Sequence, residues 1–464
     1  MNGHDYPAFL ANKFRSLPAS GLQVIPDLPS TLFPHQDCLA RWALKRGRAA
    51  VFADTGLGKS YMELAWANAI VCAAGHDVML AAPLAVAAQT ARIGESIGIE
   101  VNVCRDDSDV RCGINITNYD RLHRFDTRRF PAVGLDESSV IKHHDAKTFA
   151  FLLDAFSEAK FRSCWTATPA PNDWTELGTH AEFLDVCSRS EMLAEFFVHD
   201  GGDTQSWRLK GHAREKFWRW VATWGAMVRR PSDLGFDDAR YALPPLVHHE
   251  HVVPSEQATD GFLFALEAKT LSERRNARRA SIDRRVASAA EVINSTDRPW
   301  IIWCDLNAES EMLAAAVEDA VEIRGSHTAD EKETAFLDFA EGRIKRLVTK
   351  PSIAGWGLNW QHCRDMAFVG VTDSFEAYYQ AVRRCWRFGQ TQPVNVHVFA
   401  SEAEGAVIAN LRRKERDAIS MAEALAAETR DAVRAEIMGT TRETNAYHAA
   451  SCIAVPLWLE TEVA

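Results

Sequence analysis

Residues 53–60 read Ala-Asp-Thr-Gly-Leu-Gly-Lys-Ser, a spacing that could bind a polyphosphate. Gly56 and Gly58 carry no side chain, so successive backbone N–H groups could approach phosphate oxygens closely. Lys59 would add a positive charge, and Ser60 would add a hydroxyl ligand for Mg²⁺. A short apolar run precedes the loop and a helical pattern follows it, which is the strand, loop and helix order of a Walker A phosphate-binding loop. We therefore expect a nucleotide site here.

Two adjacent acids end another apolar run. Asp136 and Glu137 follow residues 132–135 directly, and buried carboxylates are costly unless they have a partner. Because Mg²⁺ would be such a partner, we assign Asp136 to the metal, through water. Glu137 would orient and deprotonate the water that attacks a γ-phosphate. The next apolar run ends at Thr166 and Thr168, whose hydroxyls could hydrogen-bond to the acids and sense the γ-phosphate.

A third group of candidate residues lies far along the chain. Residues 380–390 read Gln-Ala-Val-Arg-Arg-Cys-Trp-Arg-Phe-Gly-Gln. Arg384 and Arg387 are three positions apart, so on a helix they would share one face. Two guanidinium groups delivered from another lobe match the arginine fingers that stabilise charge on a transferring phosphoryl group. A surface helix with salt bridges is the alternative, but the neighbouring Trp, Phe and Gly favour a packed interface.

Gln36 lies in a short motif ahead of the phosphate loop, Leu-Phe-Pro-His-Gln at 32–36. A glutamine amide offers a donor and an acceptor, which suits the N6/N7 edge of adenine, and a nearby aromatic ring could stack on the base. An ordinary helix N-terminus would explain the same residues. The position shortly before the phosphate loop favours the adenine contact.

These groups can meet only if a sheet positions them. Short apolar runs alternate with longer amphipathic segments in two regions, which indicates two mostly parallel sheets flanked by helices. The expected strands are 49–53, 78–82, 101–104, 114–117, 132–135 and 161–166 in the first region, and 300–304, 321–323, 346–349, 366–370 and 394–399 in the second. Ligands of such sheets bind at the carboxyl ends of the strands. The tryptophans at 218, 220 and 224 are expected in the core rather than as base-stacking platforms.

Composition is that of a globular protein, with 47% hydrophobic and 25% charged residues in 464 positions. Ten cysteines include no C-x-x-C pair, so neither a zinc module nor a disulfide framework is indicated. We find no membrane-length apolar run and no signal peptide, and we expect a cytoplasmic protein without a membrane partner. The net charge of −11 argues mildly against a nucleic-acid partner. Basic clusters nevertheless occur at 45–48, 121–129, 229–230 and 274–285.

The order of motifs resembles the superfamily II helicases, and within them the Swi/Snf-like DNA translocases in a short prokaryotic or phage-encoded form. The resemblance runs from about residue 32 to 400. Its most specific part is Gly-x-Gly-Leu-Asn at 355–359, followed by Gln-Ala-x-x-Arg-x-x-Arg and Phe-Gly-Gln at 380–390.

This resemblance implies an α/β fold with two RecA-like lobes, which close over ATP and Mg²⁺ and move along double-stranded DNA. It implies nucleotide contacts from Gln36, Thr55, Gly56, Gly58, Lys59, Ser60, Gly357 and Gln380, metal binding by Ser60 and Asp136, and hydrolysis by Lys59, Asp136, Glu137, Arg384 and Arg387. Coupling to nucleic acid would involve Thr117, Thr166, Thr168 and Lys350. Three positions depart from the family pattern: Ser138-Ser139 replaces Ala or Gly followed by His, Lys350 begins a variant of a Ser-Thr-Arg run, and Arg383 stands where Asp is common.

The expected domains are a lead-in at 1–30, an ATP-binding lobe at 31–245, a linker or hinge at 246–290, a second lobe at 291–410 and a helical C-terminal extension at 411–464. The expected function is a DNA-dependent ATPase. Two alternatives stay open, a strand-separating DNA or RNA helicase and a nucleotide-gated binding protein with little turnover. A phosphate-loop kinase is disfavoured, because a second sheet bearing paired arginines is unnecessary for a small phosphate acceptor.

Overall fold

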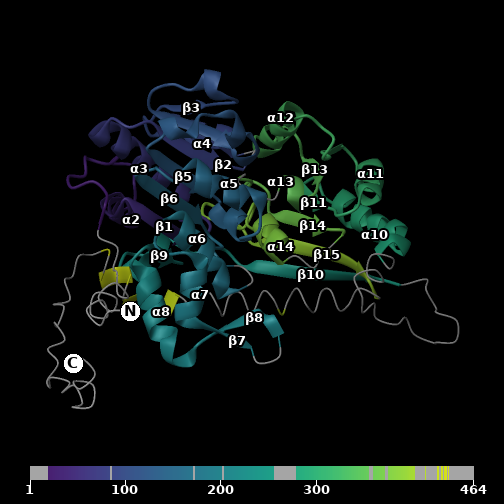
Figure 1. The fold of residues 1–464 in the computed structure, drawn as a ribbon. Helices are drawn as coiled ribbons and strands as arrows, with labels where there is room; N and C mark the ends of the chain where they lie inside the picture. Colours follow the sequence, from purple (N-terminus) through teal and green to yellow (C-terminus); the bar gives the residue numbers. More distant parts are fainter. Residues whose placement is uncertain are drawn as a thin grey trace, which may run out of the picture.

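The computed structural model describes residues 19–83, 86–170, 173–200, 203–254, 278–354, 359–370 and 375–402, and in the C-terminal part Arg413, Ala426, Ala427, Arg430, Asp431, Val433, Arg434, Ala435 and Ile437. Strands and helices alternate along the chain and form two lobes side by side (Figure 1). The first lobe is purple to teal in Figure 1, and the second is mostly green to yellow, with its edge strand β10 in teal.

The first lobe is built on a seven-stranded sheet in the order β3-β4-β2-β5-β6-β1-β9, with parallel neighbours throughout. Its strands are β1 (Arg48–Ala53), β2 (Val78–Ala82), β3 (Val101–Val103), β4 (Ile114–Asn118), β5 (Ala132–Asp136), β6 (Phe161–Thr166) and β9 (Gly225–Val228). Alternate strand residues enter opposite cores, Val51 and Ala53 on one face and Ala50 and Phe52 on the other. Both faces of the sheet are therefore covered, as a parallel sheet requires.

Helices α2 (Pro34–Arg46), α3 (Lys59–Ala74) and α4 (Ala87–Ser96) pack on one face of this sheet. The other face carries α5 (Lys147–Ala155), α6 (Leu177–Phe183), α7 (Arg189–Phe196) and α8 (Arg214–Ala222). A two-stranded antiparallel hairpin of β7 (Phe197–Asp200) and β8 (Asp203–Leu209) extends from the α7 and α8 side (Figure 1). Trp218 and Trp224 are buried in this second core and Trp220 packs against it, so the prediction of core tryptophans is confirmed.

The second lobe has a six-stranded sheet in the order β10-β15-β14-β11-β13-β12, again with parallel pairs. Its strands are β10 (Leu246–Val253), β11 (Trp300–Trp303), β12 (Ala320–Glu322), β13 (Arg346–Thr349), β14 (Asp365–Phe368) and β15 (Val394–Ser401). Helices α12 (Ala329–Ala340), α13 (Pro351–Ala354) and α14 (Phe375–Val382) lie on one face, and α10 (Ile282–Asn294) and α11 (Asn307–Ala316) lie on the other. Two RecA-like lobes, each a parallel sheet flanked by helices, thus make up the fold.

The strands expected from the sequence are present, with ends shifted by one or two residues. Four strands were not expected, β7, β8, β9 and β10. We predicted a linker or hinge from residue 246, but Leu246–Val253 pairs along its whole length with Val394–Ser401 and so belongs to the second sheet. The reason is that β10 reads Leu-Val-His-His-Glu-His-Val-Val, and the polar residues of an edge strand hide its strand pattern.

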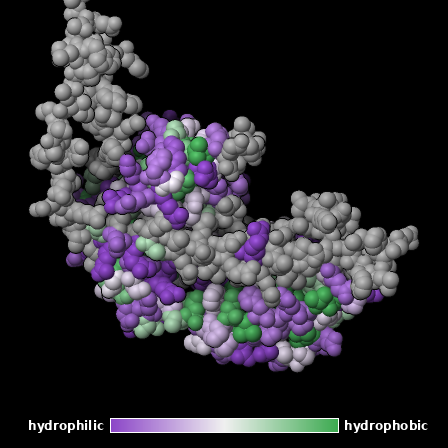
Figure 2. Space-filling model, turned by 90° about the horizontal axis from the view of Figure 1, so that it is seen from below, coloured by the Kyte–Doolittle hydropathy of each residue, from purple (hydrophilic) through white to green (hydrophobic). Residues whose placement is uncertain are grey.

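The described residues between 413 and 437 are helical, and several of them contact the first lobe. Val433 is buried in its core and Arg430 forms an ion pair with Asp233 at 3.3 Å. Seen from below, the described surface is mostly hydrophilic, and the hydrophobic residues form small separate areas (Figure 2). Within the described ranges, the structure contains no helix long and apolar enough to span a membrane.

Candidate nucleotide site between the two lobes

The phosphate-binding loop joins β1 to α3 at the centre of the first lobe. Gly56 and Gly58 have φ angles of 92° and 84°, which non-glycine residues rarely adopt. A Cβ atom at Gly58 would lie 2.2 Å from Gln36 Nε2, so this position also lacks space for a side chain. Lys59 Nζ donates a hydrogen bond to the Ala53 carbonyl at 3.0 Å. The predicted strand, loop and helix are therefore present, and the Lys59 side chain folds back over the loop.

The two acids lie beside this loop because β5, β6 and β1 are neighbours in the sheet. Asp136 pairs with Trp165 and Phe52 pairs with Thr166, so the carboxyl ends of these strands meet at one edge. Asp136 and Glu137 are both buried. Burial and the nearby Glu137 carboxylate raise the pKa of Asp136 to about 7, although Lys59 and the Glu137 N–H act in the opposite direction.

Glu137 has a strained backbone. Its φ is 50°, a left-handed conformation that costs a non-glycine residue on the order of 1 kcal/mol or more. Its N–H donates to Asp136 Oδ1 at 2.9 Å, while Glu137 Oε2 has no hydrogen-bond partner among the described residues. Such strain and such an orphaned oxygen are typical of functional positions.

The hydroxyls after β6 do not contact the acids in this structure. Thr166 Oγ1 accepts a hydrogen bond from Thr168 N at 3.1 Å, and Thr168 Oγ1 is buried without a partner in the described part of the chain. Ser138, in the position that departs from the family pattern, lies 3.1 Å from His180 Nε2 through its Oγ. The acid pair is therefore connected to α6 through Ser138, a contact that the sequence did not predict.

The paired arginines come from the second lobe and face the first. Burial lowers the pKa of Arg384 to about 10, with opposing effects from Glu137, Cys385 and Asp136. Burial and the neighbouring Arg384 lower the pKa of Arg387 to about 9, and Glu137 again opposes the shift. The electrostatic partners of both guanidinium groups thus include Glu137 of the first lobe, and those of Arg384 also include Asp136.

The geometry that brings these arginines together differs from our prediction. We expected one helix face, but α14 ends at Val382 and both residues lie in the turns that follow it. Arg384 N bonds to Ala381 O at 3.2 Å, and Trp386 N bonds to Val382 O at 3.0 Å. Gln380 positions Arg384 through two hydrogen bonds. Arg384 Nε donates to the Gln380 main-chain oxygen at 3.0 Å, and Arg384 Nη2 donates to Gln380 Oε1 at 3.2 Å.

Charged groups of both lobes shift the pKa of Lys59. Burial lowers its pKa, Glu137, Asp136 and Asp54 raise it, and Arg387 of the second lobe lowers it further. The second lobe also contacts the loop directly: a Cβ atom at Gly56 would lie 2.9 Å from Phe388 N. Lys59 and Arg387, far apart in sequence, are therefore close to one site between the lobes.

A third acid in this site was not predicted. Glu63 of α3 is fully buried, and neither of its carboxylate oxygens has a hydrogen-bond partner within the described residues. Burial, Asp136 and Glu137 raise its pKa well above the usual value. A Cβ atom at Gly134 would lie 3.0 Å from Glu63 Oε1, so Gly134 leaves room for this side chain. A glutamate within a helical pattern is normally exposed to solvent, so nothing in the sequence marked Glu63 as part of the site.

The side-chain amide of Gln36 forms hydrogen bonds with main-chain atoms around the loop. Its Oε1 accepts from Phe33 N at 3.0 Å, and its Nε2 donates to Leu57 O at 2.9 Å. An aromatic group lies next to it: Tyr241 and Phe388 are stacked with centroids 4.8 Å apart, and Phe33 meets both at about 6 Å. The aromatic rings expected near Gln36 are thus present, and they come from both lobes.

The remaining predicted residues lie in the loop itself, elsewhere in the two lobes, or outside the described chain. Thr117 is buried and donates to the Cys104 carbonyl at 2.9 Å, which gives it a structural role in the sheet. Lys350 donates to Asn307 Oδ1 at 2.7 Å on the second lobe. Gly357 lies outside the described residues. Thr55 and Ser60 lie at the site: Thr55 N bonds to Asp54 Oδ1 at 2.6 Å, and Ser60 is the second residue of α3, directly after Lys59.

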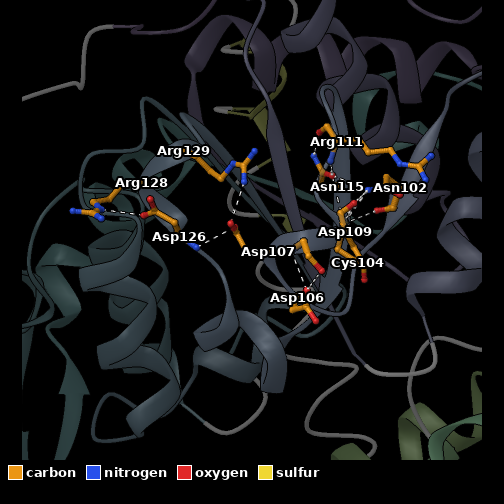
Figure 3. Close-up of polar contacts among 11 residues, drawn as sticks. Asn102, Cys104, Asp106, Asp107, Asp109, Arg111, Asn115, Asp126, Arg128 and Arg129 are labelled. Atoms are coloured by element: carbon orange, nitrogen blue, oxygen red, sulfur yellow. Dashed lines mark hydrogen bonds and ion pairs between the residues drawn. The ribbon is translucent and has the colours of Figure 1, made fainter.

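The basic run at 121–129 is partly neutralised by neighbouring acids (Figure 3). Arg128 pairs with Asp126 at 3.0 Å, and Arg129 pairs with Asp107 at 3.2 Å. Exposed ion pairs of this kind add little stability, but they reduce the positive charge available to phosphates. These two residues are therefore weak candidates for a nucleic-acid contact.

A cavity of about 320 Å³ lies elsewhere between the lobes. Residues of α4 and α12 line it, together with Asn359. The lysine, acids and arginines described above are not among its lining residues. The cavity is therefore separate from the nucleotide site.

The comparison with protein families agrees with the fold. The family described as helicase conserved C-terminal domain matches residues 285–389, a segment that ends just after Arg384, Arg387 and Phe388. This match supports placing the chain among the helicase superfamily members. Among curated proteins, no match is found. Within the described residues there is no group of three or more His, Cys, Asp or Glu side chains arranged to hold a metal ion.

Proposed function

We propose that this protein hydrolyses ATP in the cleft between its lobes and uses the energy to move along double-stranded DNA, as a Swi/Snf-like translocase. The helicase C-terminal match supports a helicase-type, nucleic-acid-associated ATPase. The observation that carries the proposal is the convergence of Lys59 and the acid pair with Arg384 and Arg387 across the interface. The choice of duplex DNA follows from the resemblance of the motifs.

The charges of the site fit a magnesium-bound triphosphate. Burial lowers the pKa of Lys59 and lowers those of Arg384 and Arg387 to about 10 and about 9, so for these three cations the loss of solvation outweighs the attraction of the nearby acids. Burial raises the pKa of Asp136 to about 7, which shows a carboxylate short of a positive partner. A polyphosphate would compensate the cations and a divalent metal would compensate the carboxylate.

Each residue then has a specific task. The N–H groups of residues 56–60 would hold the β- and γ-phosphate oxygens, and Lys59 would leave the Ala53 carbonyl to contact the phosphates. Ser60 and Asp136 would hold Mg²⁺, which when bound neutralises charge on the β- and γ-oxygens. A single pair of side chains suffices, because Mg²⁺ usually keeps several waters and takes phosphate oxygens as further ligands.

Glu137 is the residue best placed to orient and deprotonate the attacking water. Glu137 Oε2, which has no hydrogen-bond partner among the described residues, could accept the water proton. The left-handed backbone of Glu137 fixes this carboxylate beside Asp136 and the paired arginines. Arg384 and Arg387 would stabilise the charge that develops on the transferred phosphoryl group. Because they belong to the second lobe, hydrolysis would require closed lobes, which is how chemistry would be coupled to movement.

Base recognition would involve Gln36 and the aromatic group of Phe33, Tyr241 and Phe388. Each Gln36 amide atom already has one main-chain partner, and an amide oxygen and NH₂ group can each accept or donate one more hydrogen bond. Stacking of adenine would require Tyr241 and Phe388 to separate from their 4.8 Å contact. Contact with DNA would be mainly through phosphates, so binding would depend on salt and little on sequence.

The test is phosphate release by the purified full chain with duplex DNA, single-stranded DNA, duplex RNA and single-stranded RNA, each at equal nucleotide concentration. We expect stimulation by duplex DNA above the others, and its loss in Lys59→Ala. Stronger stimulation by a single strand or by RNA would favour the strand-separating alternative. Tight nucleotide binding without stimulated phosphate release would favour a nucleotide-gated binding protein and contradict the proposal.

A further inference from the structure

Asp54 directly follows β1, within the phosphate-binding loop, and contacts the second lobe. Tyr379 donates its hydroxyl to Asp54 Oδ1 at 3.1 Å, and Arg383 Nη2 lies 3.4 Å from Asp54 Oδ2. Both partners belong to α14 and the turn after it, next to the paired arginines. One carboxylate of the first lobe thus receives two donors from the second.

Neighbouring residues hold both Asp54 and Arg383 in place. Asp54 is held within its own lobe, because its N–H donates to Val228 O at 2.9 Å and its Oδ1 accepts from Thr55 N at 2.6 Å. On the other side, the Arg383 guanidinium lies over the rings of Tyr379 and Trp386, at 5.0 and 4.7 Å from their centroids. The Arg383 side chain is only 8% exposed, so the pair is largely shielded from solvent.

The electrostatics of the three groups agree with this geometry. Burial alone would raise the pKa of Asp54, but Arg383, the Thr55 N–H, Arg229 and Lys59 together hold it below its usual value. The pKa of Arg383 is raised despite its burial, chiefly by Asp54. The ion pair is therefore favourable in its surroundings, in contrast to Arg384 and Arg387, whose pKa values are lowered.

We propose that Asp54, Tyr379 and Arg383 form a cross-lobe latch that positions Arg384 and Arg387 over the phosphate-binding loop. Asp54, Tyr379 and Arg383 are positioning residues in this assignment. They act through Arg384 and Arg387, which follow Arg383 in the chain. The catalytic consequence rests on the proposed function, while the effect of the latch on lobe closure does not. The usual Asp of the related helicases at position 383 could not make this contact, because two carboxylates would repel each other.

The first test measures closure without nucleotide. Small-angle X-ray scattering of the full chain should give a larger radius of gyration for Arg383→Gln and for Tyr379→Phe than for the wild type. Tyr378→Phe is the matched control, because the adjacent hydroxyl lies 3.4 Å from His248 Nδ1 within the second lobe. Arg343→Gln is the control for charge, because Arg343 pairs with Asp338 of the same lobe. Unchanged scattering in both latch variants would overturn the proposal.

The second test is a double-mutant cycle on DNA-stimulated turnover. Asp54→Asn and Arg383→Gln should each lower kcat about tenfold, as expected for the loss of a charge-assisted contact, and the double variant should be no slower than the slower single variant. Dissociation constants for ADP should change less than twofold, because ADP lacks the γ-phosphate that Arg384 and Arg387 would contact. Multiplying effects in the double variant, or an unchanged kcat, would refute the latch.

Two safeguards keep these outcomes separate. Tyr379→Phe removes a single hydroxyl, and its melting temperature, followed by circular dichroism, should stay close to that of the wild type, so misfolding cannot explain its result. If the wild type shows no stimulated turnover, the proposed function fails while scattering still decides on the latch. If the wild type turns over normally and the variants scatter and turn over like it, only the latch fails.

Discussion

Replacing Asp136 by Asn should make the nucleotide-free protein more stable, by an amount that depends on pH. The carboxyl is buried, and its pKa is raised from 3.8 to about 7 by burial and by Glu137. Asparagine has nearly the same shape, carries no charge, and can still accept the Glu137 N–H through its side-chain oxygen. The substitution therefore removes an electrostatic penalty and preserves the local hydrogen bond.

The sign and size of the effect follow from proton linkage. Between pH 3.8 and about 7 the folded protein holds a proton on Asp136 that the unfolded chain has released, so this group lowers the free energy of unfolding as the pH rises. The loss is about 1.4 kcal/mol per pH unit, or about 2 to 3 kcal/mol between pH 5 and pH 7, and it is constant above pH 7. The advantage of Asp136→Asn should grow by the same amount.

The assay is urea unfolding of wild type and Asp136→Asn in EDTA at pH 5 and pH 8. Asp154→Asn, an exposed position on α5 of the same lobe, is the matched control and should show no such difference. An advantage of Asp136→Asn that is equal at the two pH values would show that its carboxyl is not held neutral in the folded protein. Asp136 would then impose no pH-dependent electrostatic penalty on the nucleotide-free protein.

Three further predictions concern turnover and binding. Glu137→Gln should retain nucleotide binding and lose measurable phosphate release, and retained turnover would remove the water-activating role of Glu137. Arg387→Ala should bind ATP normally and turn over roughly 10³-fold more slowly or worse; a normal single-turnover rate would exclude Arg387 from the transition state. The affinity for duplex DNA, measured by fluorescence anisotropy, should fall steeply between 50 and 200 mM salt. Contact with several phosphates predicts a fall by about a factor of 10 or more. A salt-independent affinity would argue against a phosphate-based interface.

Much of the sheet architecture could be predicted from the sequence, because strands buried on both faces read as short apolar runs. The end of β5 at Asp136 and the loop before Lys59 are fixed by local patterns, namely acids after an apolar run and glycines before a helix. The polar edge strand β10 escaped prediction, because half-exposed strands do not show this signal. Local signals thus located the first-lobe half of the site.

The second half of the site depends on tertiary packing that local signals do not contain. No glycine or proline marks the end of α14 at Val382, so a continued helix was the natural expectation for Arg384 and Arg387. The contact between Asp54 and Arg383 joins positions more than 300 residues apart. Glu63 is polar on a buried helix, and only the space left by Gly134 explains its position. Each of these features requires both lobes, or two layers of one lobe, to be placed together.

The most direct test of the central claim is photo-crosslinking with an ATP analogue that carries an aryl azide on its γ-phosphate. After irradiation with Mg²⁺ and duplex DNA, peptides bearing the probe would be identified by mass spectrometry. Labelled peptides should come both from the phosphate-binding loop around Lys59 and from the turn that contains Arg384 and Arg387, and labelling should be lost in Lys59→Ala. Labelling confined to the first lobe would contradict a triphosphate site shared by the two lobes.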